Sequence, residues 1–491
     1  MTHSLRLAAA ASALALAAGA AGAQGVETVY PALYGEPSNL DPIYDTNLPA
    51  LNVYYAIYDR LATIDAEGRV QPQMASSWTY SDDLKTWTFT LNEGMTCHTG
   101  EPMDAADVVF TYKTALSETT SRLGGYFGLI ESVEATSPTE VVFQLKAPFA
   151  PFDRQTTLAG IVCQEQYEAM GKEAFGRNPV GSGPYKFVEW SAGDSIATTR
   201  YEGYFGEPGQ YPNVVFKPVP DGTTRANSVQ SGDLSMALLE PSLVPAVKEA
   251  GAVEVVTQPS NRVIYVGFNS NAPFLGEEKV RKAIDLSIDR KLIGENLLNG
   301  AVTPVAQLLA PVTFGYNPDL KPTEQDLDAA KALLEEAGYD GSTITLSYPT
   351  TGLPQVDQLA QAVAYFMGQA GMKVEFDAQE QTTFLNNWFT SKLPGVYIFA
   401  FAPSVIDGNL PYHMLLKTGG QGYTFDARID ALMDQQIAET DGDKRAELLG
   451  QVGEIVYERT IYAPLFNDDY IYGVAKDVEW TPRPDGMMTF R

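Results

Sequence analysis

The chain is poor in the residues that most often carry metal or covalent chemistry, with three histidines and two cysteines among 491 residues. His98 and His413 lie far apart, and neither a His-Glu-x-x-His nor a Cys-x-x-Cys motif occurs. Gly-x-Ser-x-Gly and Ser-x-x-Lys are also missing. These absences argue against a zinc site and remove the best-known serine-hydrolase signatures, although they do not exclude every catalytic triad.

Positive charge is scarce as well. The sequence has 33 Lys and Arg against 61 Asp and Glu, for a formal net charge of −28. Such a surface repels nucleic acid phosphates and anionic lipid headgroups, so we expect no nucleic acid partner. The simplest interpretation of the acid excess is solubility, and a specific basic partner is the alternative.

Long hydrophobic runs are confined to the N-terminus. Arg6 precedes an Ala- and Leu-rich run over 7–18, and small residues follow at 21–23. This pattern predicts a signal peptide over 1–23, cleaved before Gln24. Its apolar core is shorter than the ~20 residues of a membrane span. Because no cysteine follows the cleavage site, we expect a periplasmic protein that is not a lipoprotein and has no stable membrane insertion.

The rest of the chain is long enough for more than one hydrophobic core. Alternating apolar residues over 78–80 and 87–91, around an Asp-rich turn, predict a β-hairpin. A strand over 140–145 and a helix over 104–116 complete an α+β block. Later, strands over 343–348 and 372–376 flank a helix over 356–370, which suggests a mainly parallel sheet.

Three local features allow simple structural interpretations. Cys97 and Cys163 are candidates for a disulfide in an oxidising compartment, with two separate buried thiols as a nearly equal alternative. The Gly-Ser-Gly-Pro segment over 181–184 lacks the end of a phosphate loop and reads as a tight turn. The acid pairs 82–83 and 468–469 read as solvated turn residues rather than as the two carboxyls of a glycosidase.

Several blocks spread over the chain together resemble one family, the large solute-binding proteins of ABC importers (family 5), which includes oligopeptide, dipeptide and nickel binders. The blocks are EPSNLDP (36–42), YDRL (58–61), MASSW (74–78), TWTFTLNEG (86–94), HTG (98–100), AADVVF (105–110), NPVGSGPY (178–185), GFN (267–269), VRKAI (280–284) and AKALL (330–334). The resemblance covers essentially the whole chain after the predicted signal peptide.

The resemblance implies a two-lobed α/β fold of the large type II periplasmic-binding-protein kind, with an extra α+β subdomain in the first lobe. Lobe I would comprise 24–66, 181–262 and 468–491, its extra subdomain 67–180, and lobe II 263–467. Two crossing segments, near 260–267 and 466–473, would act as hinges.

The resemblance also implies ligand contacts between the lobes. The positions that fall where relatives touch ligand include Glu36, Ser38, Tyr126, Glu240, Phe384, Trp388, Phe401 and Ser404. Peptide binders of the family typically carry an Asp that pairs with the free amine of the peptide, and Pro403 stands there in this chain. A buried ammonium without a carboxylate is costly, so Glu36, Glu240 or Asp407 would have to replace it.

We therefore expect a monomeric receptor that reversibly binds a small polar organic solute, of the peptide, opine or oligosaccharide class, and delivers it to the ABC permease subunits of the inner membrane. It would need no cofactor and no metal, and it would not be an enzyme. The main alternative is an exported hydrolase acting on peptides or glycosides. A chaperone-like or chemoreceptor-docking protein is a third interpretation.

Overall fold

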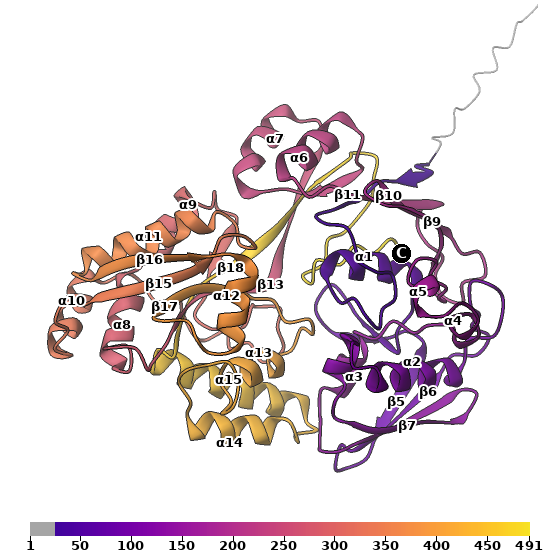
Figure 1. Cartoon of the computed structure of the whole chain (residues 1–491), viewed down its shortest axis with the longest axis horizontal. Coiled ribbons are helices and arrows are strands. Elements are labelled where there is room, and N and C mark those ends of the chain that lie inside the picture. Colours follow the sequence, from indigo (N-terminus) through magenta and orange to yellow (C-terminus); the bar gives the residue numbers. More distant parts are fainter. Residues whose placement is uncertain (1–24) are drawn as a thin grey trace, which may run out of the picture.

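The computed structural model describes residues 25–491, and its ribbon forms two bodies joined by two long strands (Figure 1). The predicted signal peptide and its cleavage site lie outside the described residues. No helix in this range is both long and apolar enough to cross a bilayer. We call the body that contains most of residues 25–253 lobe I and the body formed by 269–461 lobe II.

Lobe I is built on two larger sheets and a small one. Its first sheet has the order β1-β11-β10-β9, with β2 also paired to β11. A four-stranded sheet of order β5-β6-β8-β7 and the β3-β4 pair lie nearer the other end. The strands are β1 (Thr28–Val29), β2 (Ala32–Leu33), β3 (Ala62–Ile64), β4 (Val70–Pro72), β5 (Ala75–Tyr80), β6 (Thr86–Leu91), β7 (Ile130–Ser137), β8 (Glu140–Leu145), β9 (Tyr185–Ser191), β10 (Ser195–Arg200) and β11 (Asn213–Pro218). The helices are α1 (Leu48–Ile57), α2 (Ala105–Ser117), η1 (Leu123–Tyr126), α3 (Phe152–Thr156), α4 (Gln164–Met170), α5 (Lys172–Phe175), α6 (Gly222–Ser231), η2 (Pro241–Leu243) and α7 (Val244–Ala250).

The predicted α+β block is confirmed. Strands β5 and β6 pair antiparallel, with Trp78 opposite Phe89, and β8 follows on the other side of β6. Trp87 and Phe89 are buried while the alternating threonines are more exposed, which is the half-buried pattern that the sequence predicts. Helix α2 begins after Asp104, whose side chain accepts a hydrogen bond from the backbone of Ala106.

Two strands, β13 (Glu254–Phe268) and β18 (Tyr462–Val474), run from one lobe into the other and pair antiparallel along most of their length. Their register breaks between Pro259 and Val263. The lobe I end pairs with β12 (Met236–Leu238), and the lobe II end of β13 pairs with β17 (Val396–Phe401). The segments 260–267 and 466–473 that the sequence marks as crossings both lie within these strands. The boundary proposed after residue 262 falls beside the register break.

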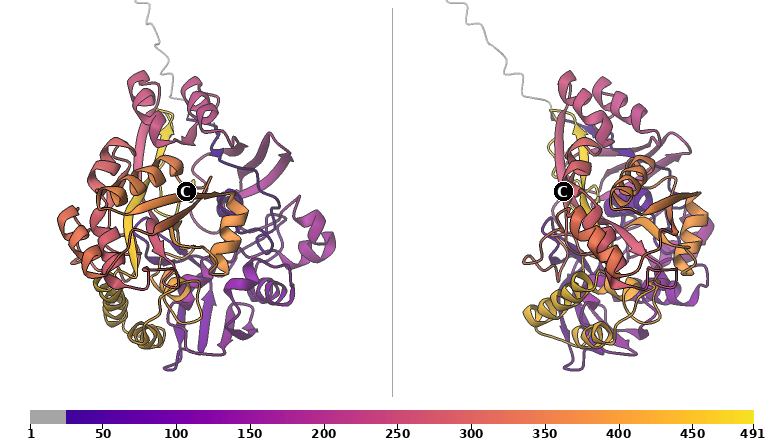
Figure 2. Two further views of the ribbon diagram at one scale, coloured as in Figure 1. Left: turned by 60° about the vertical axis from the view of Figure 1, so that its left-hand side comes forward. Right: turned by 90° about the vertical axis from the view of Figure 1, so that its left-hand side faces the viewer.

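Lobe II continues the same sheet, in the order β12-β18-β13-β17-β15-β16, with β14 (Val302–Pro304) beside β18. Strands β15 (Thr343–Pro349) and β16 (Lys373–Gln379) are parallel and joined by α11 (Val356–Gln369), as predicted. The expectation of a mainly parallel sheet is wrong, because the long crossing strands pair antiparallel with each other and with β12, β14 and β17. The other helices are α8 (Glu278–Ser287), α9 (Arg290–Asn296), α10 (Leu327–Glu336), α12 (Gln381–Phe389), α13 (Asn409–Leu415), α14 (Ala427–Gln436) and α15 (Gly442–Glu458). The turned views place the helices of α6–α7 and of α14–α15 at opposite ends of the molecule (Figure 2).

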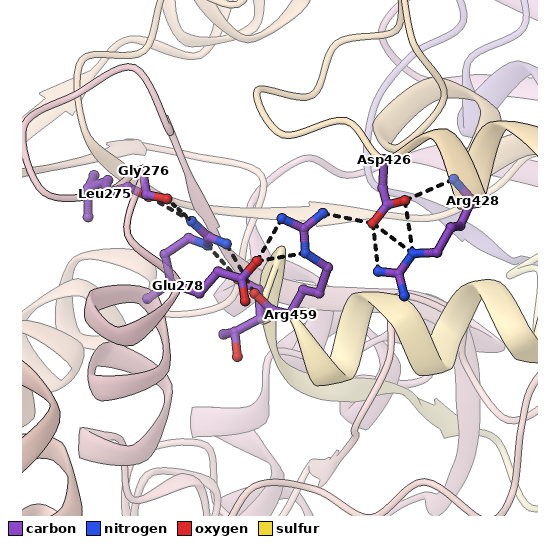
Figure 3. A network of polar contacts seen from close by, with 8 residues as sticks. Leu275, Gly276, Glu278, Asp426, Arg428 and Arg459 are labelled. Atoms are coloured by element: carbon purple, nitrogen blue, oxygen red, sulfur yellow. Dashed lines mark hydrogen bonds and ion pairs between the residues drawn. The ribbon is translucent and has the colours of Figure 1, made fainter. Parts of the chain in front are cut away.

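An ion-pair network fixes the α14–α15 pair to the rest of lobe II (Figure 3). Arg459, just after α15, donates to Glu278 of α8 at 2.7 Å and to Asp426, the residue before α14, at 2.7 Å. Hydrogen bonds from Arg428 and Arg459 hold the pKa of Asp426 below its usual range. Helix α15 also carries Arg445, which binds Asp407 of lobe II, and Arg154 of lobe I lies 3.5 Å from the same carboxylate.

The Gly-Ser-Gly-Pro segment packs closely against the end of α1. Gly183 donates its backbone N–H to the carbonyl of Ile57 at 2.9 Å, and a Cβ at Gly181 would lie 2.2 Å from the same oxygen. His98 donates from Nε2 to the carbonyl of Gly183 at 3.0 Å, and its Nδ1 accepts from the backbone N–H of Gly181 at 3.4 Å. Burial lowers the pKa of His98 to about 4, so the ring is neutral at pH 7. Both the glycines and the histidine of the motif therefore have structural roles here.

Cys97 and Cys163 are bonded to each other in the structure, with their Cα atoms 6.2 Å apart and a sequence separation of 66. A bond closing a loop of this length restricts the unfolded chain, so reduction should lower the free energy of unfolding by about 2–4 kcal/mol. Urea unfolding with and without dithiothreitol measures the change. The double variant Cys97→Ala/Cys163→Ala is the control and should not respond to the reductant. Two thiols titrating in the denatured, unreduced protein would contradict the pairing.

Candidate ligand-binding cleft

Two adjoining cavities lie where the lobes face each other. The larger has a volume of about 380 Å³ and the smaller about 150 Å³, and both are lined by Leu48 and Tyr470. The larger cavity draws its walls from lobe I (Tyr34, 238–241), from lobe II (298, 301–302 and 352–354) and from the crossing strands. The smaller is lined on the lobe II side by 402–404. A solute held here would contact both lobes and the strands that join them.

Adjacent carboxylates on β18 have different partners at the larger cavity. Asp468 is buried and accepts hydrogen bonds from Arg262 Nε at 2.9 Å and from Ser260 Oγ at 2.8 Å, with further contact to Arg262 Nη2. The side chain of Asp469 makes no hydrogen bond or ion pair with any residue in the described range 25–491. Asp469 is therefore a carboxylate of this cavity that remains available to a cation.

The environment of Asp469 makes its charge sensitive to pH. Burial raises the pKa of Asp469 to about 6, and the nearby negative charge of Asp468 adds to the effect. A ligand cation next to Asp469 would favour the ionised form and lower this pKa again. The interpretation of 468–469 as a solvated turn is wrong, because both residues belong to a strand in the sheet between the lobes.

Glu240, one of the ligand contacts that the resemblance implies, lines the same cavity on the lobe I side. Its Oε1 lies 3.3 Å from Nη2 of Arg225, and its side chain is 49% exposed. Arg225 is buried and also donates to the carbonyls of 219, 220 and 238. Much of the charge of Arg225 is therefore solvated by backbone oxygens, and Glu240 keeps one oxygen without a hydrogen bond in the described structure.

Of the other predicted contacts, Tyr126 and Ser404 meet across the lobes. Tyr126 ends the short helix η1 of lobe I, and its hydroxyl lies 3.2 Å from Oγ of Ser404 in lobe II. Ser404 lines the smaller cavity together with Pro403, whose carbonyl accepts a hydrogen bond from Asn261 at 2.8 Å. Phe401 lies at the end of β17, partly buried, next to the cavity-lining segment 402–404 but not on either cavity wall.

The structure corrects the placement of four predicted contacts. Phe384 and Trp388 are one turn apart on α12, and both are buried in the core of lobe II against Phe399, with ring centroids 5.2 Å and 5.0 Å away. Glu36 accepts hydrogen bonds from Trp190 and from the backbone of 193, so it holds the β9–β10 hairpin. Ser38 donates to Asp45 at 2.7 Å. None of the four lines either cavity.

Three charged residues of the cleft were not assigned to it from the sequence. Arg60, Arg262 and Asp469 all line the cavities. Arg60 follows Asp59 in the YDRL block within the otherwise apolar stretch 53–64, and Arg262 stands in a strand pattern, so a charged residue in a largely apolar stretch was the available signal.

Asp407, one of the candidates to replace the missing family Asp, is already paired. Arg445 binds it with two hydrogen bonds of 2.8 and 2.6 Å, and Nε of Arg154, from α3 in lobe I, lies 3.5 Å away. Burial alone would raise the pKa of Asp407, but these two arginines hold it below its usual value. Arg154 also donates to the carbonyl of Ile406 at 3.2 Å. Asp407 thus connects the lobes and is not available to a ligand amine.

Replacing Arg154 by methionine should favour separation of the lobes, because the contacts to Ile406 and Asp407 that it makes across the cleft are lost. Hydrogen bonds to charged groups contribute about 1.5–3 kcal/mol. We expect these contacts to stabilise the closed, ligand-bound form as well as the unliganded form, so their loss should weaken ligand binding too. We expect a larger radius of gyration by small-angle X-ray scattering and roughly three- to tenfold weaker ligand binding. Arg69→Gln, which removes an exposed arginine of lobe I, is the control. An unchanged radius in the Arg154 variant would argue against this role.

These features define a class of protein, a two-lobed receptor with a solute cleft at its hinge. The family model for bacterial extracellular solute-binding proteins, family 5 (middle part), matches residues 69–423. The chain belongs to this family of solute-binding proteins of ABC importers, and a hydrolase finds no support.

Relatives and solved structures agree with this assignment. Glutathione-binding proteins (GsiB) of Escherichia coli and Shigella flexneri are 27% identical over 466 residues, covering 90% of this chain and 89% of theirs. The substrate-binding protein CtaP of Listeria monocytogenes superposes with a TM-score of 0.86 at 24% identity, covering 95% of this chain and 98% of that one. The periplasmic binding protein DppA of Helicobacter pylori, solved with the peptide STSA, gives a TM-score of 0.78 at 21% identity, covering 94% and 96%.

Proposed function

We propose that the chain captures a small peptide-like solute with a free amine and delivers it to an ABC permease. The observation that carries the proposal is Asp469, a half-buried carboxylate on the cavity wall between the lobes with no side-chain partner in the described range. An ammonium group would pair with it and offset the cost of its burial. Asp469 thereby supplies the negative charge that Pro403 cannot, on the crossing strand instead of in the 401–404 segment.

The size of the cleft supports a small solute. Ligand pockets commonly enclose ~300–1,000 Å³, and the larger cavity of about 380 Å³ lies at the low end of this range. The names of relatives point the same way, because the curated relatives are called glutathione-binding and one similar structure was solved with a tetrapeptide. Glutathione and such peptides all carry a free ammonium.

The remaining parts of the proposal concern export, assembly and chemistry. We infer that residues 1–23 direct export to the periplasm and that the chain acts as a monomer. The division into lobe I (24–66, 181–262, 468–491), its subdomain (67–180) and lobe II (263–467) is part of this proposal. We also infer that the solute is bound without being turned over, since the matched relatives are named as binding proteins.

A thermal-shift assay tests the proposal. Glutathione, trialanine and a dipeptide should raise the melting temperature, whereas the N-acetylated forms of the same compounds should not, because acetylation removes the charge that pairs with Asp469. A ligand at a hundred times its Kd stabilises the folded state by about 2.7 kcal/mol. Native mass spectrometry of the purified protein identifies any solute that remains bound. Stabilisation by maltose alone, or equal stabilisation by the acetylated compounds, would contradict the proposal, and release of amino acids from the peptides would favour a hydrolase.

A further inference from the structure

Arg60 is a buried arginine on the wall of the smaller cavity. It follows α1, in the segment before β3, and is 1% exposed. Its Nη1 donates to the carbonyl of Tyr58 at 3.2 Å. Among the described residues, no oxygen accepts a hydrogen bond from its Nε or its Nη2. These two groups form one edge of the guanidinium, and that edge matches the two oxygens of a carboxylate.

The orientation of this guanidinium is fixed by its neighbours. It lies over the ring of Tyr55, with its central carbon 3.7 Å from the ring centroid. A second arginine, Arg483, lies over the same ring at 5.3 Å, and Asp485 pairs with it at 3.0 Å. Stacking on an aromatic ring restricts the plane of an arginine while leaving its N–H groups available. Arg60 is thus held in place without using the donors of its Nε and Nη2.

The acids near Arg60 do not accept hydrogen bonds from its Nε or Nη2, because other residues bind them. Asp59, the preceding residue, accepts hydrogen bonds from Gln73, Tyr204 and Ser182, and Arg491 lies 3.8 Å from it. Asp485, on the cavity wall, is bound by Arg483 and by the backbone of 487. A buried charge that lacks a contacting counter-ion is costly, and a bound anion would remove that cost.

The smaller cavity has the character of a subsite for one end of a ligand. At about 150 Å³ it holds only a few non-hydrogen atoms, and Thr46, Thr157, Ser404 and Asn261 add polar groups to its wall. It adjoins the larger cavity at Leu48 and Tyr470. A solute in the larger cavity could therefore extend one end toward Arg60 while its amine remains near Asp469.

We propose that Arg60 is an anion subsite that binds a carboxylate of the solute through Nε and Nη2, so that the cleft selects solutes carrying both an ammonium and a carboxylate. This inference deepens the proposed function and rests on it for the identity of the solute. The anion subsite itself rests only on the geometry of Arg60 and the cavity. The two can therefore be tested separately.

A small anion tests the subsite alone. For the wild-type protein, sodium acetate should raise the melting temperature more than sodium chloride of the same ionic strength. The acetate-specific shift should disappear in Arg60→Gln and persist in Arg69→Gln, which removes an exposed arginine of the same lobe. Arg60→Gln without anion should melt within a few degrees of the wild type, because it removes a buried charge that lacks a contacting anion. No acetate-specific shift in the wild type, or the same shift in Arg60→Gln, would overturn the proposal.

A matched peptide pair tests the selection of the solute. By calorimetry, trialanine should bind the wild type at least tenfold more tightly than trialanine amide. Arg60→Gln should weaken trialanine at least tenfold and the amide less than twofold, and Arg60→Lys should fall between because it keeps the charge but not the fork. Equal loss for both peptides would overturn the carboxylate role of Arg60. If trialanine fails to bind while the acetate result holds, the peptide class is wrong and the anion subsite stands.

Discussion

Asp469→Asn should weaken the binding of an amine-bearing solute by roughly a hundredfold, about 2–3 kcal/mol, while the protein stays folded. Removing one partner of a desolvated charge pair typically costs about 2–5 kcal/mol. The lower figure fits here because Asp469 is only half-buried and water can reach the ammonium. Asp468 remains bound to Arg262 in this variant, so the crossing strands keep their pairing. Isothermal titration of wild type and variant with the same peptide measures the change.

The appropriate control is an acid of similar charge away from the cleft. Asp82→Asn, in the exposed turn before β6, removes one negative charge and should leave affinity within twofold. If Asp469→Asn also binds the peptide within twofold of the wild type, the amine does not pair with Asp469 and the orientation proposed for the solute fails.

The same carboxylate predicts a pH dependence. The pKa of Asp469 is raised to about 6, so in the unliganded protein the side chain is ionised above this pH and protonated below it. A cation binds the ionised form, so affinity should be greatest near pH 7, fall up to tenfold for each pH unit below about 6, and decrease again toward pH 8 as the α-ammonium of a peptide loses its proton. The stability of the unliganded protein should change with pH in the opposite direction. Because the pKa of this carboxyl is raised in the folded state, the free energy of unfolding decreases as pH rises through about 6. Titrations at pH 5, 6, 7 and 8 should show the fall at acidic pH in the wild type, and a similar fall in Asp469→Asn would assign it to another group.

Trp388→Ala should lower the free energy of unfolding by about 3–5 kcal/mol and leave the Kd of the folded protein within about twofold. The side chain is 2% exposed in the core of lobe II, where it packs on Phe399 and Phe401, so its removal leaves a cavity. Urea unfolding and calorimetry at a temperature where the variant is folded separate the two effects.

The next residue on the same helix is a matched control. Phe389 is 52% exposed, and Phe389→Ala should cost roughly 0.5 kcal/mol. Weak binding by a fully folded Trp388 variant would instead return this tryptophan to the cleft, as the family resemblance implied.

Elements with a strong local signal were predictable from the sequence. The hairpin of β5 and β6, helix α2 with its Asp104 cap, and the β15-α11-β16 unit all follow from periodicities of two or 3.6 residues and from short-range capping. The direction of pairing in the central sheet was not predictable, because β13 and β18 meet across about two hundred residues of intervening chain.

The position of the site between the lobes was predictable from the sequence, but the charged residues that line it were not. The resemblance located Glu240 and Ser404, and these line the cavities. It also selected Phe384 and Trp388, since an aromatic residue at helical spacing suits either a core or a ligand and the sequence does not separate the two. Which face of α12 turns inward is decided by packing on β17.

The sequence by itself determined the family, the two-lobed α/β architecture and the departure at Pro403, because motifs and apolar periodicity are properties of short stretches of chain. Only the tertiary structure decided which charges a solute can reach. Asp468 and Asp469 are neighbours in sequence, yet Arg262, 206 residues away from Asp468, binds that carboxylate and leaves the next one exposed to the cavity. Whether a buried charge is paired depends on groups brought together from distant segments, and the free energy of that pairing determines which ligand the cleft prefers.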